Sequence, residues 1–172
     1  MIGFPQFGSQ SPPFSLPTLD QAFALVAGAP TLLNAQSSPV GSLGAAETDL
    51  MSYVMPANTL SAANKGVLIR AWGSSAANGN SKTGKLYFGS ASVVSQFTSS
   101  ASGFAWRFDA WIVKVATDTQ AVSAMYITSN TLQLTNSSPS QTDSAPITIK
   151  VTGQGTANND LVQQGMFIFL IN

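Results

Sequence analysis

The chain of 172 residues contains only seven basic and seven acidic side chains, and it has no cysteine and no histidine. These absences exclude a Ser-His-Asp triad, a thiolate nucleophile and a histidine-based metal site. Because the net charge is zero, the sequence also lacks the basic surface that nucleic acids and anionic membranes attract, and we expect no cofactor, nucleic acid or membrane partner.

The first 46 residues, called the arm below, differ in composition from the rest of the chain. They carry a single charged residue, Asp20, and most of the prolines. Because proline holds the backbone in extended geometry, we expect an extended arm. The arm contains three phenylalanines, Phe4, Phe7 and Phe14. We interpret these rings as anchors in a groove on another protein. The alternative is that they fold back onto the core of their own chain.

One short helix is expected within the arm, near residues 19–27. Thr18 can cap it, with Gln21 three residues later as in a capping box, and Gly28 followed by Pro30 would end it. A helix this short is not stable alone, so its apolar stripe must pack on something.

A membrane span or an export signal is not expected in this part of the chain. The longest nearly apolar run, residues 22–33, has about 12 residues, whereas a membrane helix needs about 20. The first basic residue is Lys65, so the positive charge that precedes the apolar stretch of a secretory signal is missing.

From residue 47 to residue 172 the pattern is that of an all-β domain. Short segments rich in β-branched and aromatic residues are divided by clusters of Gly, Asn, Ser and Pro. The expected strands are residues 49–55, 66–73, 85–89, 92–97, 104–116, 121–128, 131–134, 147–153 and 166–171. This number of strands fits an antiparallel β-sandwich of two sheets.

Two of these segments indicate how the strands are buried. In residues 104–116, Trp106 and Phe108 alternate with Arg107 and Asp109, so Trp106 is expected in the core. Trp111 falls on the opposite face and is the candidate surface aromatic, either for stacking on a sugar ring or for an interface contact. Residues 166–171 are apolar on both faces, which is typical of a sheet centre or a subunit interface.

Glu47 and Asp49 are the closest pair of carboxylates in the sequence. On an extended backbone, residues two apart face the same side, so a shared calcium ion or a glycosidase-like acid pair is geometrically possible. However, the Asp-x-Asp-x-Asp-Gly pattern of a calcium loop is absent. The simpler interpretation is that the pair charges a strand edge, and we predict neither an enzyme nor a metal site.

Two blocks of sequence resemble a module of the structural proteins of tailed bacteriophages. The first is ETDLMSYVMPANTLSAANKGVLIRAWG, residues 47–73, and the second combines residues 147–153 with residues 157–167. The likeness extends over roughly residues 34–172 and leaves most of the arm unmatched. The resemblance implies a jelly-roll-like sandwich, often trimeric, which is made in the bacterial cytoplasm and displayed on the virion as a head decoration, fibre or tail component.

These observations predict a capsid decoration, or cement, protein. The low charge suits permanent contact with neighbouring subunits, and the chain begins with its arm rather than with the long shaft of a fibre. We expect a homotrimer whose arm grips the major capsid protein or another virion protein. The alternative is a fibre or tail adhesin, or a carbohydrate-binding module, that contacts host glycans through Trp111 or through the loops at residues 74–82 and 136–145.

Overall fold

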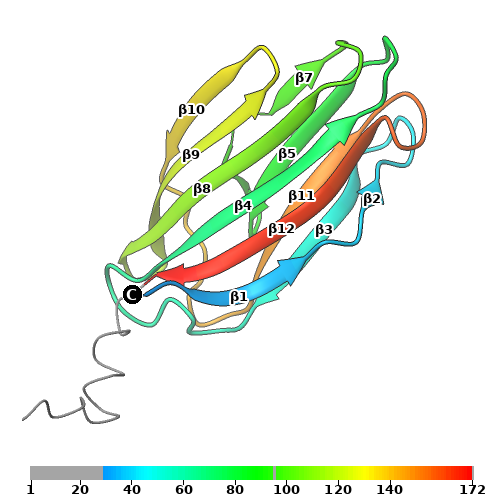
Figure 1. Ribbon diagram of the computed structural model, residues 1–172. Helices are drawn as coiled ribbons and strands as arrows, with labels where there is room; N and C mark the ends of the chain where they lie inside the picture. Colours follow the sequence, from blue (N-terminus) through cyan, green and yellow to red (C-terminus); the bar gives the residue numbers. More distant parts are fainter. Residues whose placement is uncertain (1–28, 95, 172) are drawn as a thin grey trace, which may run out of the picture.

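The computed structural model describes residues 29–94 and 96–171 of the chain (Figure 1). The described residues form only strands and connecting loops. The strands are β1 (Thr31–Gln36), β2 (Val40–Gly41), β3 (Thr48–Met55), β4 (Gly66–Ser75), β5 (Lys82–Phe88), β6 (Ala91–Ser92), β7 (Phe97–Ser99), β8 (Ala105–Ala116), β9 (Thr119–Thr128), β10 (Leu132–Ser137), β11 (Ile147–Gln154) and β12 (Leu161–Ile171). The helix expected near residues 19–27 and the proposed anchors Phe4, Phe7 and Phe14 lie outside the described residues.

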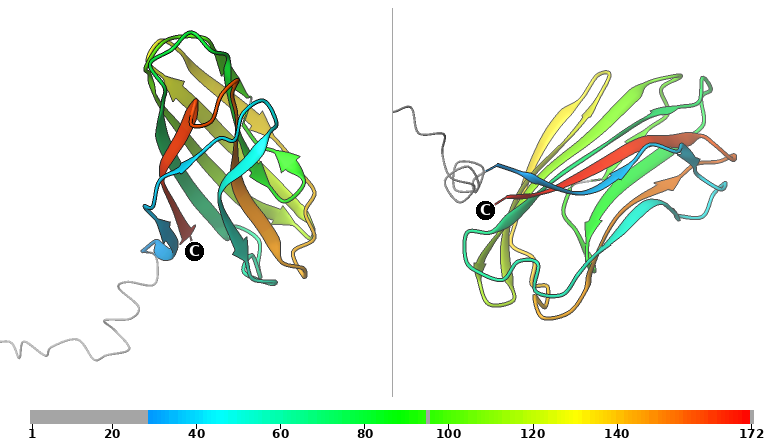
Figure 2. Two further views of the ribbon diagram at one scale, coloured as in Figure 1. Left: turned by 90° about the vertical axis from the view of Figure 1, so that its right-hand side faces the viewer. Right: turned by 60° about the horizontal axis from the view of Figure 1, so that its bottom comes forward.

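The strands form two antiparallel sheets that pack face to face (Figure 2). The seven-stranded sheet has the order β1-β12-β4-β8-β9-β10, with β2 also paired to β12, and the five-stranded sheet has the order β3-β11-β5-β6, with β7 also paired to β5. The chain passes from one sheet to the other between β2 and β3, β3 and β4, β4 and β5, β7 and β8, β10 and β11, and β11 and β12. The arrangement of β1-β12-β4-β8 against β3-β11-β5-β6 is that of a jelly roll, so the predicted all-β sandwich is confirmed.

The core lies between the sheets and follows the alternation seen in the sequence. Trp106 and Phe108 on β8 are 2% and 0% exposed, as predicted for this strand. The ring of Phe97 packs against both, with ring centroids 6.0 and 5.5 Å away, and it also contacts Phe104 and Tyr126. Burial of each such side chain contributes roughly 1.5–3 kcal/mol, so this aromatic cluster stabilises one end of the sandwich.

The N-terminal edge of the seven-stranded sheet differs from the expectation. Strands β1 and β2 lie within residues 1–46, which were expected to form an extended arm, yet both pair with β12. Pro30 and Pro39 flank β1 rather than interrupt it, and proline is tolerated at the ends of an edge strand. The sheet therefore includes residues 31–36 and 40–41 of this segment.

Two other strand boundaries also differ from the prediction. The segment expected as one strand, residues 92–97, instead begins with the last residue of β6 and ends with the first residue of β7. Between these two short strands, Val93 and Val94 are both buried and do not alternate. Strand β12 begins at Leu161 instead of residue 166. The polar Gln163 was not expected within a buried strand, but it is fully buried and its side-chain oxygen accepts a hydrogen bond from the Met51 amide.

Candidate functional site

The outer side of the seven-stranded sheet is covered mainly by apolar side chains. One row runs directly across five strands in the order Leu32, Phe169, Leu68, Trp111 and Ser123. In this row Leu32 is 52% and Trp111 is 50% exposed. The outward apolar side chains, called the apolar face below, are Leu32, Leu68, Trp72, Trp111, Met125, Ile127, Leu132, Leu134, Phe167 and Phe169.

Aromatic contacts order part of the apolar face. The Trp72 and Phe167 rings meet edge to face with centroids 5.0 Å apart, and Phe167 lies 6.3 Å from Phe169. Gly165 lies opposite Trp72 on β12, and a Cβ atom at this position would overlap the indole ring. Gly165 therefore leaves room for Trp72 to lie across β12, which widens the apolar face.

A charged triad interrupts the apolar face near its middle. Asp109 on β8 accepts a charged contact from Arg70 Nε at 2.6 Å on one carboxylate oxygen and from Arg107 Nε at 2.8 Å on the other. The Asp109 side chain is only 4% exposed, whereas the two arginines are 50% and 43% exposed. Two cations share one anion here, so the centre of the apolar face carries one excess positive charge.

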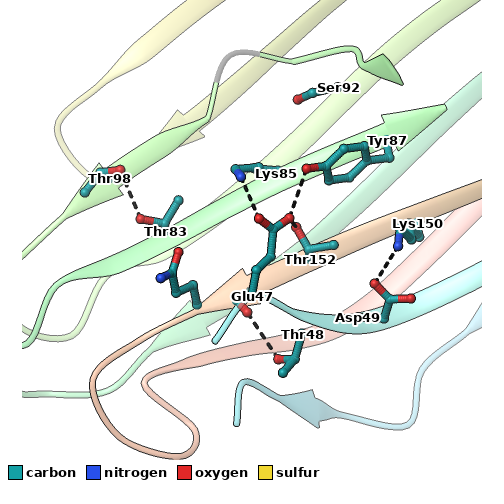
Figure 3. A network of polar contacts seen from close by, with 12 residues as sticks. Glu47, Thr48, Asp49, Thr83, Lys85, Tyr87, Ser92, Thr98, Lys150 and Thr152 are labelled. Carbon is teal, nitrogen blue, oxygen red and sulfur yellow. Dashed lines mark hydrogen bonds and ion pairs between the residues drawn. The ribbon is translucent and has the colours of Figure 1, made fainter. Parts of the chain in front are cut away.

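The outer side of the five-stranded sheet has a different character, because it carries a network of paired polar groups (Figure 3). Glu47 Oε2 accepts a hydrogen bond from Lys85 Nζ at 2.6 Å, and its Oε1 accepts from Tyr87 Oη at 3.0 Å and from Thr152 Oγ1 at 2.7 Å. These partners come from β5 and β11, which lie side by side in the sheet. Glu47 therefore joins three side chains that are distant in sequence.

The pKa values of the groups in this network do not favour a catalytic role. Burial alone would raise the pKa of Glu47, but the hydrogen bonds from Lys85, Thr152 and Tyr87 outweigh it and lower the pKa below its usual value. The bond to Glu47 raises the pKa of Lys85, and burial together with the same carboxylate raises the pKa of Tyr87. All three pKa values move away from neutral, which does not suit a proton donor or acceptor at neutral pH.

Glu47 and Asp49 share the same outer side of the five-stranded sheet, as expected from their spacing, but they do not act as a pair. Asp49 Oδ1 accepts from Lys150 Nζ at 2.7 Å, while Glu47 is held by Lys85. Within residues 29–94 and 96–171, no group of three carboxylates could hold a metal ion. The two carboxylates therefore belong to separate ion pairs, Glu47 with Lys85 and Asp49 with Lys150.

Trp111 lies on the surface, as predicted, and beside the charged triad. Its direct neighbours across the sheet are Leu68 and Ser123. Apolar, polar and charged side chains therefore all border the indole. These neighbours fit either alternative for Trp111, an interface contact or stacking on a sugar ring.

The two loops considered for glycan contact are fixed by hydrogen bonds within the domain. Asn78 and Asn80 donate to the carboxylate of Asp160, which is 1% exposed. At the second loop, Gln120 donates to Asp143 Oδ1 at 2.9 Å. Their polar side chains are thus largely used to hold the loops in place.

Neither Lys85 nor Tyr87 was predicted from the sequence as a site residue. The only available signal was local, because both alternate with the buried Leu86 and Phe88 along β5 and must therefore face outward. Their contact with Glu47 depends on the pairing of β5 with β11 and of β11 with β3.

Comparisons of the chain with protein-family models and with curated proteins find no match. We therefore infer the function from the geometry of the two outer faces. In the part of the chain that the structure describes, no helix is long and apolar enough to span a membrane.

Proposed function

We propose that this protein is a non-enzymatic structural subunit that assembles with copies of itself through the apolar face. The supporting observation is the apolar face on the outside of the seven-stranded sheet, where Leu132 and Leu134 are 62% and 64% exposed in addition to Leu32 and Trp111. Monomeric proteins rarely leave apolar patches larger than a few hundred Å² in contact with water. A second subunit placed on this face would bury them.

The dimensions of the sheet suit such an interface. Its central strands β12, β4 and β8 have 11, 10 and 12 residues, which corresponds to a length of about 35 Å at ~3.3 Å per residue. Six strands at ~4.8 Å spacing give a width of about 24 Å. The resulting area, on the order of 800 Å², equals the share of one partner in a standard protein interface.

The contrast between the two outer faces gives the assembly a direction. The apolar face would point toward the neighbouring subunits, while the ion pairs Glu47–Lys85 and Asp49–Lys150 on the five-stranded sheet would remain in water. Such an asymmetry suits a closed ring, and the resemblance to phage structural proteins favours a homotrimer. In the trimer, the five-stranded sheets would form the outer surface.

Within this assembly we assign the subunit to the surface of a bacteriophage virion, as a capsid decoration protein. The assignment is supported by the resemblance of residues 47–73, 147–153 and 157–167 to phage structural modules and by the low charge of the chain. The arm would place Phe4, Phe7 and Phe14 in a groove on the major capsid protein or another virion protein. Each buried ring contributes roughly 1.5–3 kcal/mol, and three arms acting together would multiply the effect.

Light scattering of the purified full-length protein tests the assembly. A mass near three times 17.9 kDa is expected, and a monomer at micromolar concentration would overturn the proposal. The arm is tested separately by sedimentation with phage particles. Deletion of residues 1–17 should leave the trimer intact and abolish co-sedimentation, whereas a truncated protein that still binds particles would contradict the assigned role of the arm.

A further inference from the structure

Tyr87, on the outer side of the five-stranded sheet, lies between two surface hollows. One is lined by Glu47, Asp49, Tyr87 and Lys150 among others, and the second by Lys85, Tyr87, Ser92 and Gln96 among others. Each has a volume of about 360 Å³, which falls within the ~300–1,000 Å³ range of small-molecule sites. The two hollows share Tyr87 and are together called the groove below, and we propose that this groove binds a neutral saccharide.

The Tyr87 side chain provides a fixed aromatic surface at the centre of the groove. Its hydroxyl donates to Glu47 Oε1 at 3.0 Å, and Lys150 Nζ lies 5.6 Å from the ring centroid (Figure 3). On the other neighbouring strand, β6, the residue opposite Tyr87 is the small Ser92. One side of the ring thus borders an ammonium group, while the other borders the hollow lined by Lys85, Ser92 and Gln96, in which the apolar face of a pyranose can pack.

The groove also has hydrogen-bonding capacity left over. Among the described residues, the Asp49 carboxylate accepts from Lys150 through Oδ1, which leaves Oδ2 and two ammonium protons for a ligand. Both side chains reach solvent, with exposed fractions of 57% for Asp49 and 30% for Lys150. An acceptor beside a donor matches the hydroxyl groups of a sugar, because each hydroxyl both donates and accepts.

The charge of the groove selects among saccharides. Its two carboxylates, Glu47 and Asp49, are each paired with one lysine, Lys85 and Lys150, so these four groups together carry no net charge. A sialylated or phosphorylated glycan would need a cation that is not already neutralised. The paired lining therefore favours a neutral oligosaccharide.

A glycan array that carries neutral and sialylated oligosaccharides tests this inference with the full-length protein. Binding to at least one neutral glycan is expected, and Tyr87→Ala should weaken it by roughly tenfold or more because the stacking surface is lost. Asp49→Ala, at an exposed position where folding is not at risk, should weaken it to a similar extent. Absence of binding to any neutral glycan, or binding to sialylated glycans alone, would overturn the inference.

Val54→Ala is the matched control, because Val54 is 58% exposed on β3 and lines neither hollow. This variant should bind like the wild type. If it loses binding while Tyr87→Ala and Asp49→Ala retain it, the groove is not the site. Light scattering of the same samples separates the two proposals: a monomer that binds neutral glycan overturns only the assembly, and a trimer that binds none overturns only the saccharide site.

Discussion

Leu68 on β4 and Trp111 on β8 lie directly opposite each other, and both side chains point to the outside of the seven-stranded sheet. They continue the row formed by Leu32 and Phe169. The pair lies at the middle of the sheet, where a partner subunit would exclude water most completely. Contacts of this kind dominate the free energy of many interfaces.

Trp111→Glu should therefore convert the assembly to monomers. The substitution removes the large apolar side chain at the centre of the proposed interface and replaces it with a charged, hydrated group, whose desolvation opposes association. Light scattering over a concentration series checks the result. Val54→Glu, at an exposed apolar residue on the five-stranded sheet, is the control and should leave the mass unchanged; an equal loss of mass in both variants would show that the apolar face is not the contact surface.

The triad of Asp109, Arg70 and Arg107 should respond unequally to substitution. Asp109→Ala removes a nearly buried acceptor of two charge-assisted contacts and should lower the free energy of unfolding by about 2 kcal/mol. Arg70→Ala should cost less than about 1 kcal/mol, because the Arg70 side chain is half exposed and Arg107 still pairs with the carboxylate. Urea denaturation at one fixed protein concentration measures both, and equal losses would contradict this account of the triad.

Asp160 should make the stability of the protein depend on acid pH. Burial alone would raise its pKa, but hydrogen bonds from Asn78, from the Ala157 and Thr156 amides and from Asn80 outweigh it and lower the pKa from 3.8 to about 2. Because the folded state holds its proton less tightly than the unfolded state, this contribution is fully present above about pH 4 and is lost as the pH falls toward 2.

Thermal unfolding followed by circular dichroism between pH 7 and pH 2 tests this dependence. Asp160→Asn should be less stable than the wild type at pH 7, and the difference between the two should shrink between pH 4 and pH 2. Subtraction of the two curves removes the contributions of Glu47 and Asp143, whose pKa values are also lowered. A constant difference across this range would show that Asp160 does not carry the effect.

Lys82 should be a stabilising residue despite its charge. It is 0% exposed, and its Nζ donates to the carbonyl oxygens of Asn78 at 2.6 Å and Ala101 at 3.2 Å, which ties two loops together. Lys82→Met keeps most of the volume but leaves these acceptors without that donor, so we expect a loss of about 1–3 kcal/mol in the free energy of unfolding. Lys65→Met, at a partly exposed lysine, should change it by less than about 0.5 kcal/mol.

Local alternation predicted the strands whose two faces differ most. Trp106 and Phe108 alternate with outward side chains along β8, and the observed strand starts within one residue of the expected position. The same criterion failed for the start of β12, where Gln163 is polar but fully buried. Alternation correctly placed Asp109 on the outward side of β8. The residue is nevertheless only 3% exposed, because Arg70 and Arg107 flank it.

The edge strand β1 was missed for a related reason. Composition made residues 1–46 look like an extended arm, since prolines are frequent and charges are rare. An edge strand has the same extended backbone as an arm, and the two differ only in whether a partner strand is present. Strand β12 is that partner, and the local sequence of β1 does not predict this pairing.

The sequence by itself determined that the chain has no histidine and no cysteine, that its domain is built from strands, and that Trp111 faces outward. Only the tertiary structure decided which outward side chains become neighbours. Glu47 meets Lys85 and Tyr87 across β11, and Leu68 meets Trp111 between the paired strands β4 and β8. The physical reason is that alternation gives each strand its two faces, whereas the choice and register of partner strands depend on contacts between distant parts of the chain.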